Sequence, residues 1–154
     1  MAVSLNCCVT TALNITAFVV ASLVATVAYA KTGTITGTCR VEDGDTIWVD
    51  GQGDPIEVRL SGVAAPEKKE PGGKQATEFL RTVCEGQPVR CELDGSKTRG
   101  REVGICYVTD ADIGAAVISA GLARECVRFS GGRYTGLEKP EAKHLAFPGY
   151  CSPR

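Results

Sequence analysis

The spacing of apolar residues switches twice along this chain, from every second residue to every third or fourth and back. Residues 56–60 alternate apolar with polar side chains, which is typical of a half-buried strand. Residues 76–84 place apolar side chains at helical spacing, and residues 89–93 alternate again. Because a strand buries one face and a helix one stripe, this order predicts a mixed, mainly β fold in which helices pack against a sheet.

Five strands and two helices are expected from these patterns and from the turn residues between them. The strands cover residues 34–41, 46–49, 56–60, 89–93 and 103–108, the helices cover 76–84 and 113–120, and loops cover 94–101 and 129–154. Asp50-Gly51-Gln52-Gly53 predicts a hairpin turn, and Asp110 or Asp112 is a candidate N-cap of the second helix. Three strands, a helix and two strands form the order of the OB-fold, a five-stranded, partly open barrel. We therefore expect an α+β OB-fold with one helix between strands three and four and another after strand five.

An apolar, uncharged segment precedes this domain and ends in Ala28-Tyr29-Ala30. The small residues at its end predict a secretory signal peptide over residues 1–30, cleaved before Lys31. The mature chain is then one domain, residues 31–154, with a core over about 34–128, and the protein is secreted or periplasmic. Because the leader has no Lys or Arg and approaches the length of a spanning helix, an uncleaved membrane anchor is the alternative.

Cysteine usage favours disulfide bonds. Of the eight cysteines, Cys7 and Cys8 lie in the leader, so six fall in the mature domain: Cys39, Cys84, Cys91, Cys106, Cys126 and Cys151. An even number in an exported domain predicts three disulfides, whereas zinc is disfavoured because no two of the six have zinc-ligand spacing. Cys91 and Cys106 lie on the fourth and fifth expected strands, which should be adjacent and antiparallel, so we predict that they are bonded. The other four remain unassigned.

The charge balance excludes nucleic-acid binding through an overall positive charge of the domain. The chain has 17 Lys and Arg against 18 Asp and Glu, a net charge of −1. It therefore lacks the overall basic footprint of many nucleic-acid-binding domains. Any binding of a phosphate group must come from a local cluster of cations.

Two carboxylates flank a glycine where the first two expected strands meet. In Val41-Glu42-Asp43-Gly44-Asp45-Thr46, the side chains of Asp43 and Asp45 can aim oxygen ligands at a hard cation. Taken alone, the same residues make an ordinary hairpin turn, because Asp and Gly are common in turns. Residues elsewhere in the chain favour the first interpretation.

Further charged residues accompany this turn in Arg59-Leu60-Ser61-Gly62-Val63-Ala64-Ala65-Pro66-Glu67 and in Gly100-Arg101. With the turn and Gly121-Leu122-Ala123, these segments resemble the staphylococcal nuclease (thermonuclease) family. The resemblance covers most of the mature chain. It implies that Asp45 binds calcium, that Arg59 and Arg101 hold the phosphate of DNA or RNA, and that Glu67 activates a water molecule.

The resemblance fails at one position that bears on the metal. The family's second calcium-binding carboxylate lies two residues before the proline, and here that residue is Ala64. Calcium affinity depends on the number of charged ligands, so we expect a weakened site in which Asp43 or water molecules replace the missing acid.

Three hypotheses follow. The first is a secreted or periplasmic nuclease-like phosphodiesterase that uses a divalent cation at Asp45 and Asp43, with Glu67 as base. The second is a non-catalytic nucleic-acid- or phosphate-binding module with the same arginines. The third is a disulfide-stabilised envelope protein, in which Arg59 forms a structural salt bridge and Glu67 is a solvated loop acid.

Overall fold

The computed structural model describes residues 32–152, so the predicted signal peptide, its cleavage site and the membrane-anchor alternative lie outside the described residues. The large sheet contains β1 (Thr32–Asp43), β2 (Thr46–Asp50), β3 (Ile56–Leu60), β5 (Pro88–Thr98), β6 (Arg101–Val108) and β7 (Ala111–Asp112), and a small sheet contains β4 (Val63–Ala64) and β8 (Arg124–Glu125). The helices are α1 (Gly73–Cys84), α2 (Ile113–Ser119) and α3 (Val127–Ser130), and the 3₁₀ turns are η1 (Pro140–His144) and η2 (Gly149–Cys151). None of the helices within 32–152 is long and apolar enough to cross a membrane.

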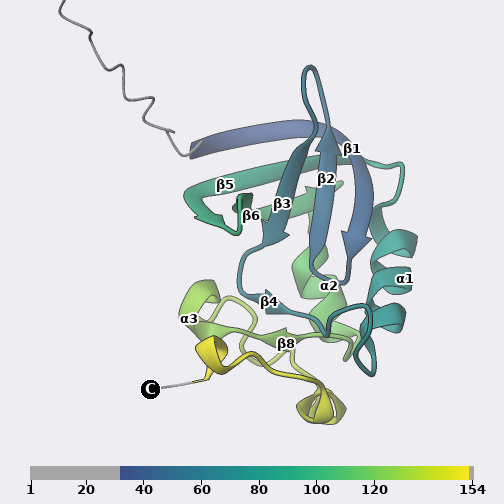
Figure 1. The fold of residues 1–154 in the computed structure, drawn as a ribbon, viewed down its shortest axis with the longest axis vertical. Coiled ribbons are helices and arrows are strands. Elements are labelled where there is room, and N and C mark those ends of the chain that lie inside the picture. Colours follow the sequence, from purple (N-terminus) through teal and green to yellow (C-terminus); the bar gives the residue numbers. More distant parts are fainter. Residues whose placement is uncertain (1–31, 153–154) are drawn as a thin grey trace, which may run out of the picture.

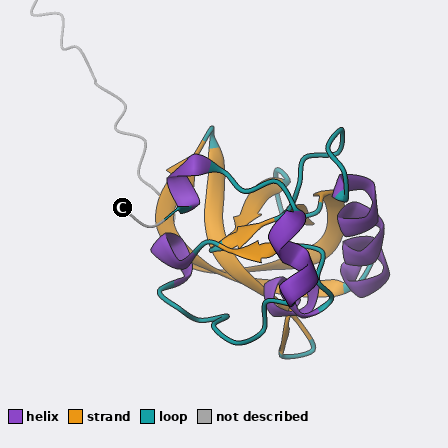
Figure 2. Cartoon of the chain, turned by 90° about the horizontal axis from the view of Figure 1, so that it is seen from below, coloured by secondary structure: helices purple, strands orange, loops and turns teal. Residues whose placement is uncertain are grey.

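The large sheet closes on itself. Its strands follow the order β3-β2-β1-β5-β6-β7, and β3 also pairs in parallel with β6, placing Arg59 beside Val103. Helix α1 lies between the third and fourth long strands in sequence, and α2 follows the fifth. In Figure 1, α1 runs along one side of the strands while α2 and α3 lie beneath them, and the turned view in Figure 2 shows shorter helices in front of the curved strands with α1 still at their side. The mixed α+β class and the element order of the OB-fold are confirmed.

The sequence pattern underestimated the length of β5. Residues 94–101 were expected to form a loop, but β5 continues to Thr98. Lys97 pairs with Glu102 and Thr98 with Arg101 beyond an irregularity in the register that starts after Leu93. The end of the β5–β6 pair consists of polar residues held by backbone hydrogen bonds. Such residues show no alternation of apolar and polar side chains, so the sequence pattern could not predict this part of the strand.

Inward-facing strand residues and one face of each long helix form the core. Tyr134, which lies beyond the predicted core in the C-terminal segment, is the largest fully buried side chain, at 1% exposure. The other large, fully buried apolar residues include Ile47, Val49, Val58, Leu60, Val63, Leu80, Ile113, Val117 and Ile118. The C-terminal segment is therefore packed against the domain through a central aromatic ring.

Three disulfides use all six cysteines of the described domain. Cys91 is bonded to Cys106, its direct partner in the β5–β6 register, with Cα atoms 4.0 Å apart, which is the pair that strand adjacency favours. The remaining bonds are Cys39–Cys84, which joins β1 to α1, and Cys126–Cys151, which joins the N-cap of α3 to η2. The four cysteines left unassigned from the sequence thus tie helical segments to the sheet and to each other.

Of the two candidate N-caps of α2, Asp112 is the one in place. Its Oδ1 accepts hydrogen bonds from the backbone N–H groups of Gly114 at 2.9 Å and Ala115 at 3.1 Å. The hydroxyl of Tyr134 donates to Asp112 Oδ2 at 3.2 Å. Burial raises the pKa of Tyr134, and the neighbouring Asp112 carboxylate raises it further, so the phenol stays protonated and able to donate.

We expect Asp112→Ala to lower the free energy of unfolding by about 2 kcal/mol, because it removes a helix cap and leaves the buried Tyr134 hydroxyl without its acceptor. Urea unfolding measures this change. Asp54→Ala, at an exposed turn residue, is the control and should stay within about 0.5 kcal/mol of wild type. Equal stabilities for the two variants would contradict the capping role.

Candidate functional site

The turn between β1 and β2 holds its two carboxylates in fixed positions. Asp43 Oδ1 accepts a hydrogen bond from the backbone N–H of Asp45 at 3.1 Å. Asp45 is 6% exposed, and its Oδ2 accepts from the backbone N–H of Ala65 at 3.0 Å. Gly44 is required here, because a Cβ would lie 2.7 Å from that of Ala76 on α1 and 2.8 Å from that of Ala65. The turn is thus pressed between α1 and the segment after β4.

Arg59 on β3 forms a nearly buried ion pair with Asp45. The Arg59 Nη1 contacts Asp45 Oδ1, and the two side chains are only 15% and 9% exposed. Strand pairing explains the contact, because Arg59 lies opposite Thr46, the residue after Asp45. Burial lowers the pKa of Arg59, whereas Tyr150 and Asp43 raise it. An arginine starts from a pKa far above neutrality, so Arg59 remains a cation.

Arg101 at the start of β6 reaches the same turn. Its Nη1 donates to Thr46 Oγ1 at 3.1 Å, and that hydroxyl donates to Asp45 Oδ1 at 3.2 Å. Arg59 and Arg101 are far apart in sequence, yet the β3–β6 pairing brings both guanidinium groups to the Asp45–Thr46 corner. We call Asp43, Asp45, Arg59 and Arg101 the charge cluster. It brings two cations and two anions together at the turn between β1 and β2.

Glu67 lies outside the charge cluster. It is exposed, in a turn where its backbone N–H donates to Glu70 Oε2 at 2.8 Å. The neighbouring Lys68 pairs with Glu42 at 2.6 Å and so holds this turn against the end of β1. Among the contacts of residues 32–152, none joins the Glu67 carboxylate to the charge cluster, so its role as a base stays a prediction.

Ala64 is enclosed by apolar groups. It is 0% exposed and packs with Cys126, Cys151 and Phe147. A methyl group against a disulfide therefore occupies the position where the resemblance placed a second calcium-binding carboxylate.

The donor set of the charge cluster fits a calcium ion poorly. Calcium takes six to eight oxygen ligands, several of them carboxylate oxygens. Asp45 already accepts bonds on both of its oxygens, and Ala64 contributes none. Within residues 32–152 there is no group of three or more His, Cys, Asp or Glu side chains that could hold a metal. Asp43 and Asp45 alone would need most of the coordination shell to come from water and substrate.

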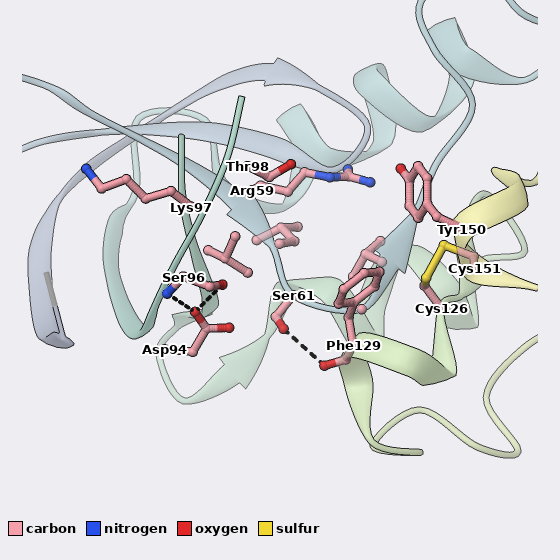
Figure 3. A pocket seen from close by; sticks show the side chains of 14 residues that line it. Arg59, Ser61, Asp94, Ser96, Lys97, Thr98, Cys126, Phe129, Tyr150 and Cys151 are labelled. Atoms are coloured by element: carbon pink, nitrogen blue, oxygen red, sulfur yellow. Dashed lines mark hydrogen bonds between the residues drawn. A yellow bond between two sulfur atoms is a disulfide. The ribbon is translucent and has the colours of Figure 1, made fainter. Parts of the chain in front are cut away.

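A cleft of about 330 Å³ opens beside Arg59 (Figure 3). Its polar lining includes Ser61, Lys97 and Thr98, and its far wall carries Phe129 and Tyr150. These two aromatic rings lie 6.1 Å apart, edge to face, and are 52% and 51% exposed. Sequence reasoning missed both rings because they lie in the predicted loop. Both rings lie close in sequence to Cys126 and Cys151, and this proximity to cysteines was the feature of the sequence that could have indicated an ordered segment.

Comparisons with known proteins identify relatives for most of this domain. A family model described as "Staphylococcal nuclease homologue" matches residues 57–144. The chain is 32% identical over 85 residues to an "Uncharacterized endonuclease" of Escherichia coli O157:H7, which covers 54% of this chain and 56% of that protein. It is 36% identical over 93 residues to the "Thermonuclease" of Staphylococcus intermedius, covering 55% of each. It is also 35% identical over 101 residues to "Succinoglycan biosynthesis protein ExoI" of Rhizobium meliloti (strain 1021), covering 58% and 51%. The chain thus spans about half the length of the curated relatives it matches.

Proposed function

Because the chain belongs to the staphylococcal nuclease homologue family, we propose that it is a phosphodiesterase that cleaves DNA or RNA. The observation that carries this proposal is the convergence of Arg59 and Arg101 on the Asp45–Thr46 corner, next to a cleft. Guanidinium groups bind phosphate through paired N–H donors, so two of them at one corner suit a phosphodiester.

The proposed reaction is attack of water on phosphorus. Negative charge grows on the non-bridging phosphate oxygens in the transition state, and Arg59 and Arg101 stabilise it electrostatically. Glu67, on an exposed turn, is proposed to accept the proton of the attacking water. Displacement of the leaving oxygen completes the cleavage of the P–O bond.

The use of a divalent cation is a separate proposal. Family members generally use calcium, and Asp43 and Asp45 are the residues of this cluster that could contact it. Because these residues fit calcium poorly, we assign charge stabilisation to the arginines and expect any calcium dependence to require about millimolar concentrations, as in other weak sites.

Export to the periplasm or the medium also stays a proposal. Three disulfides in one small domain support it, because such bonds persist in oxidising compartments. The intact mass of the exported protein, expected to begin at Lys31, tests it.

A non-catalytic binding module is the second candidate. It is favoured by the apolar surroundings of Ala64 and by the ion pair that already engages Arg59. Such a module would bind single-stranded or duplex nucleic acid through the same arginines and leave it intact.

Cleavage of a fluorescent oligonucleotide, with EDTA and with 10 mM calcium, separates these functions. We expect wild type to cleave and Arg101→Ala to lower kcat/KM about 100-fold, because one donor to the developing charge is lost. Arg81→Ala, which removes an equal charge from the exposed surface of α1, should leave cleavage unchanged. Binding that depends on Arg101 without cleavage in either buffer would establish the binding module, and absence of both would refute both functions.

A further inference from the structure

A tyrosine of the C-terminal segment lies beside the charge cluster. Tyr150 lies in η2, and Figure 3 shows its hydroxyl facing the guanidinium group of Arg59 at the edge of the cleft. Arg59 lies on β3 and Tyr150 in η2, so the two residues are far apart in the sequence. Tyr150 is therefore placed at the cluster by the tertiary structure.

Arg59 has donors left for more than one partner. A guanidinium group carries five N–H donors, and Nη1 is directed at Asp45. The Tyr150 hydroxyl faces the same group (Figure 3). Burial lowers the pKa of Arg59, and the nearby Tyr150 opposes this effect. Asp45 thus lies on one side of the guanidinium group and Tyr150 on another, and Arg59 and Tyr150 both line the cleft.

The Cys126–Cys151 disulfide lies next to Tyr150 and joins η2 to the N-cap of α3. The Tyr150 ring is 51% exposed, so its own packing is incomplete, and it lies in a 3₁₀ turn of only three residues. A short segment with few buried contacts opens easily unless it is tied down. Cys126 and Cys151, by contrast, are 2% and 4% exposed and pack on Ala64. The small Ala64 side chain leaves room for the bond that anchors η2.

We propose that Tyr150 is a positioning residue for Arg59 and that the Cys126–Cys151 disulfide holds it there. The inference rests on the proposed function in one respect, that Arg59 binds the phosphate group. Tyr150 acts through Arg59: it orients the guanidinium group toward the cleft before substrate arrives, which reduces the ordering required on binding.

Tyr150→Phe is the direct test, because it removes the hydroxyl and keeps the ring. We expect the Arg59 Nε–Hε signal in ¹⁵N NMR spectra of the ligand-free protein to shift. We also expect about 10-fold weaker binding of a 5′-phosphorylated single-stranded oligonucleotide, with a rise in KM of similar size and a smaller change in kcat. Tyr107→Phe is the matched control, since that ring contacts Arg90 rather than Arg59, and it should change none of these quantities.

The disulfide is tested by Cys126→Ala/Cys151→Ala against Cys91→Ala/Cys106→Ala, with folding checked by circular dichroism. Only the first pair should reproduce the effects of Tyr150→Phe. An unmoved Arg59 signal in Tyr150→Phe, or tighter oligonucleotide binding, would overturn the inference even if the cysteine variants fail to fold. If wild type binds no oligonucleotide, the proposed function fails, while the Arg59 signal still decides the role of Tyr150.

Discussion

Replacing Arg59 by methionine should lower the free energy of unfolding by about 3 to 5 kcal/mol and reduce cleavage by about 1,000-fold. The stability loss arises because the carboxylate of Asp45, 9% exposed, is left without its counter-ion. The loss of cleavage arises because a donor to the developing phosphate charge is gone. Urea unfolding and oligonucleotide cleavage measure the two effects separately.

The double variant Arg59→Met/Asp45→Asn distinguishes these causes. Removing the orphaned charge should recover most of the lost stability, since a buried ion pair is often replaced at little net loss, whereas cleavage should stay low. Arg40→Met is the control, because its ion pair with Asp50 is exposed and should contribute less than about 1 kcal/mol. If Arg59→Met is as stable as wild type, the ion pair is not the central structural contact of the cluster.

In the Ala64→Asp variant, calcium should bind near the introduced carboxylate and stabilise the folded protein. In EDTA we expect this variant to lose about 3 kcal/mol or more, because an acid is forced into a site that is 0% exposed and lined by a disulfide. Calcium at 10 mM should restore much of that loss and raise Tm, and cleavage should saturate at lower calcium than in wild type. Thermal unfolding with and without calcium measures the gain.

Two variants isolate the contribution of the added charge. Ala64→Asn has nearly the same shape and should lose stability without a calcium response. Asp45→Ala in the Ala64→Asp background should abolish the response, because the introduced acid is then left with only Asp43 as a second carboxylate. Strong stabilisation of wild type by micromolar calcium would show that our reading of the donor set is wrong. Failure of Ala64→Asp to respond would favour the binding module.

Local patterns in the sequence were sufficient for the order of the five long strands and the two longer helices. Alternation and helical spacing each report which face of a segment is buried, so strands such as Ile56–Leu60 and the helix ending at Cys84 could be predicted. The same information located Cys91 and Cys106 on neighbouring strands. Strands β4, β7 and β8 have two residues each and carry no period, so they could not be found in this way.

The composition of the site depended on contacts between distant segments. The sequence by itself placed Asp45 at the turn between the first two expected strands, Arg59 on the third and Arg101 just before the fifth. Only the tertiary structure decided that Asp45 and Arg59 form an ion pair, that Ala64 packs on Cys126–Cys151, and that Tyr150 faces Arg59. The physical reason is that the spacing of apolar residues shows which face of a strand or helix is buried. It does not show which other segment packs against that face. That choice is made by the packing of the C-terminal segment, which has no regular period of its own.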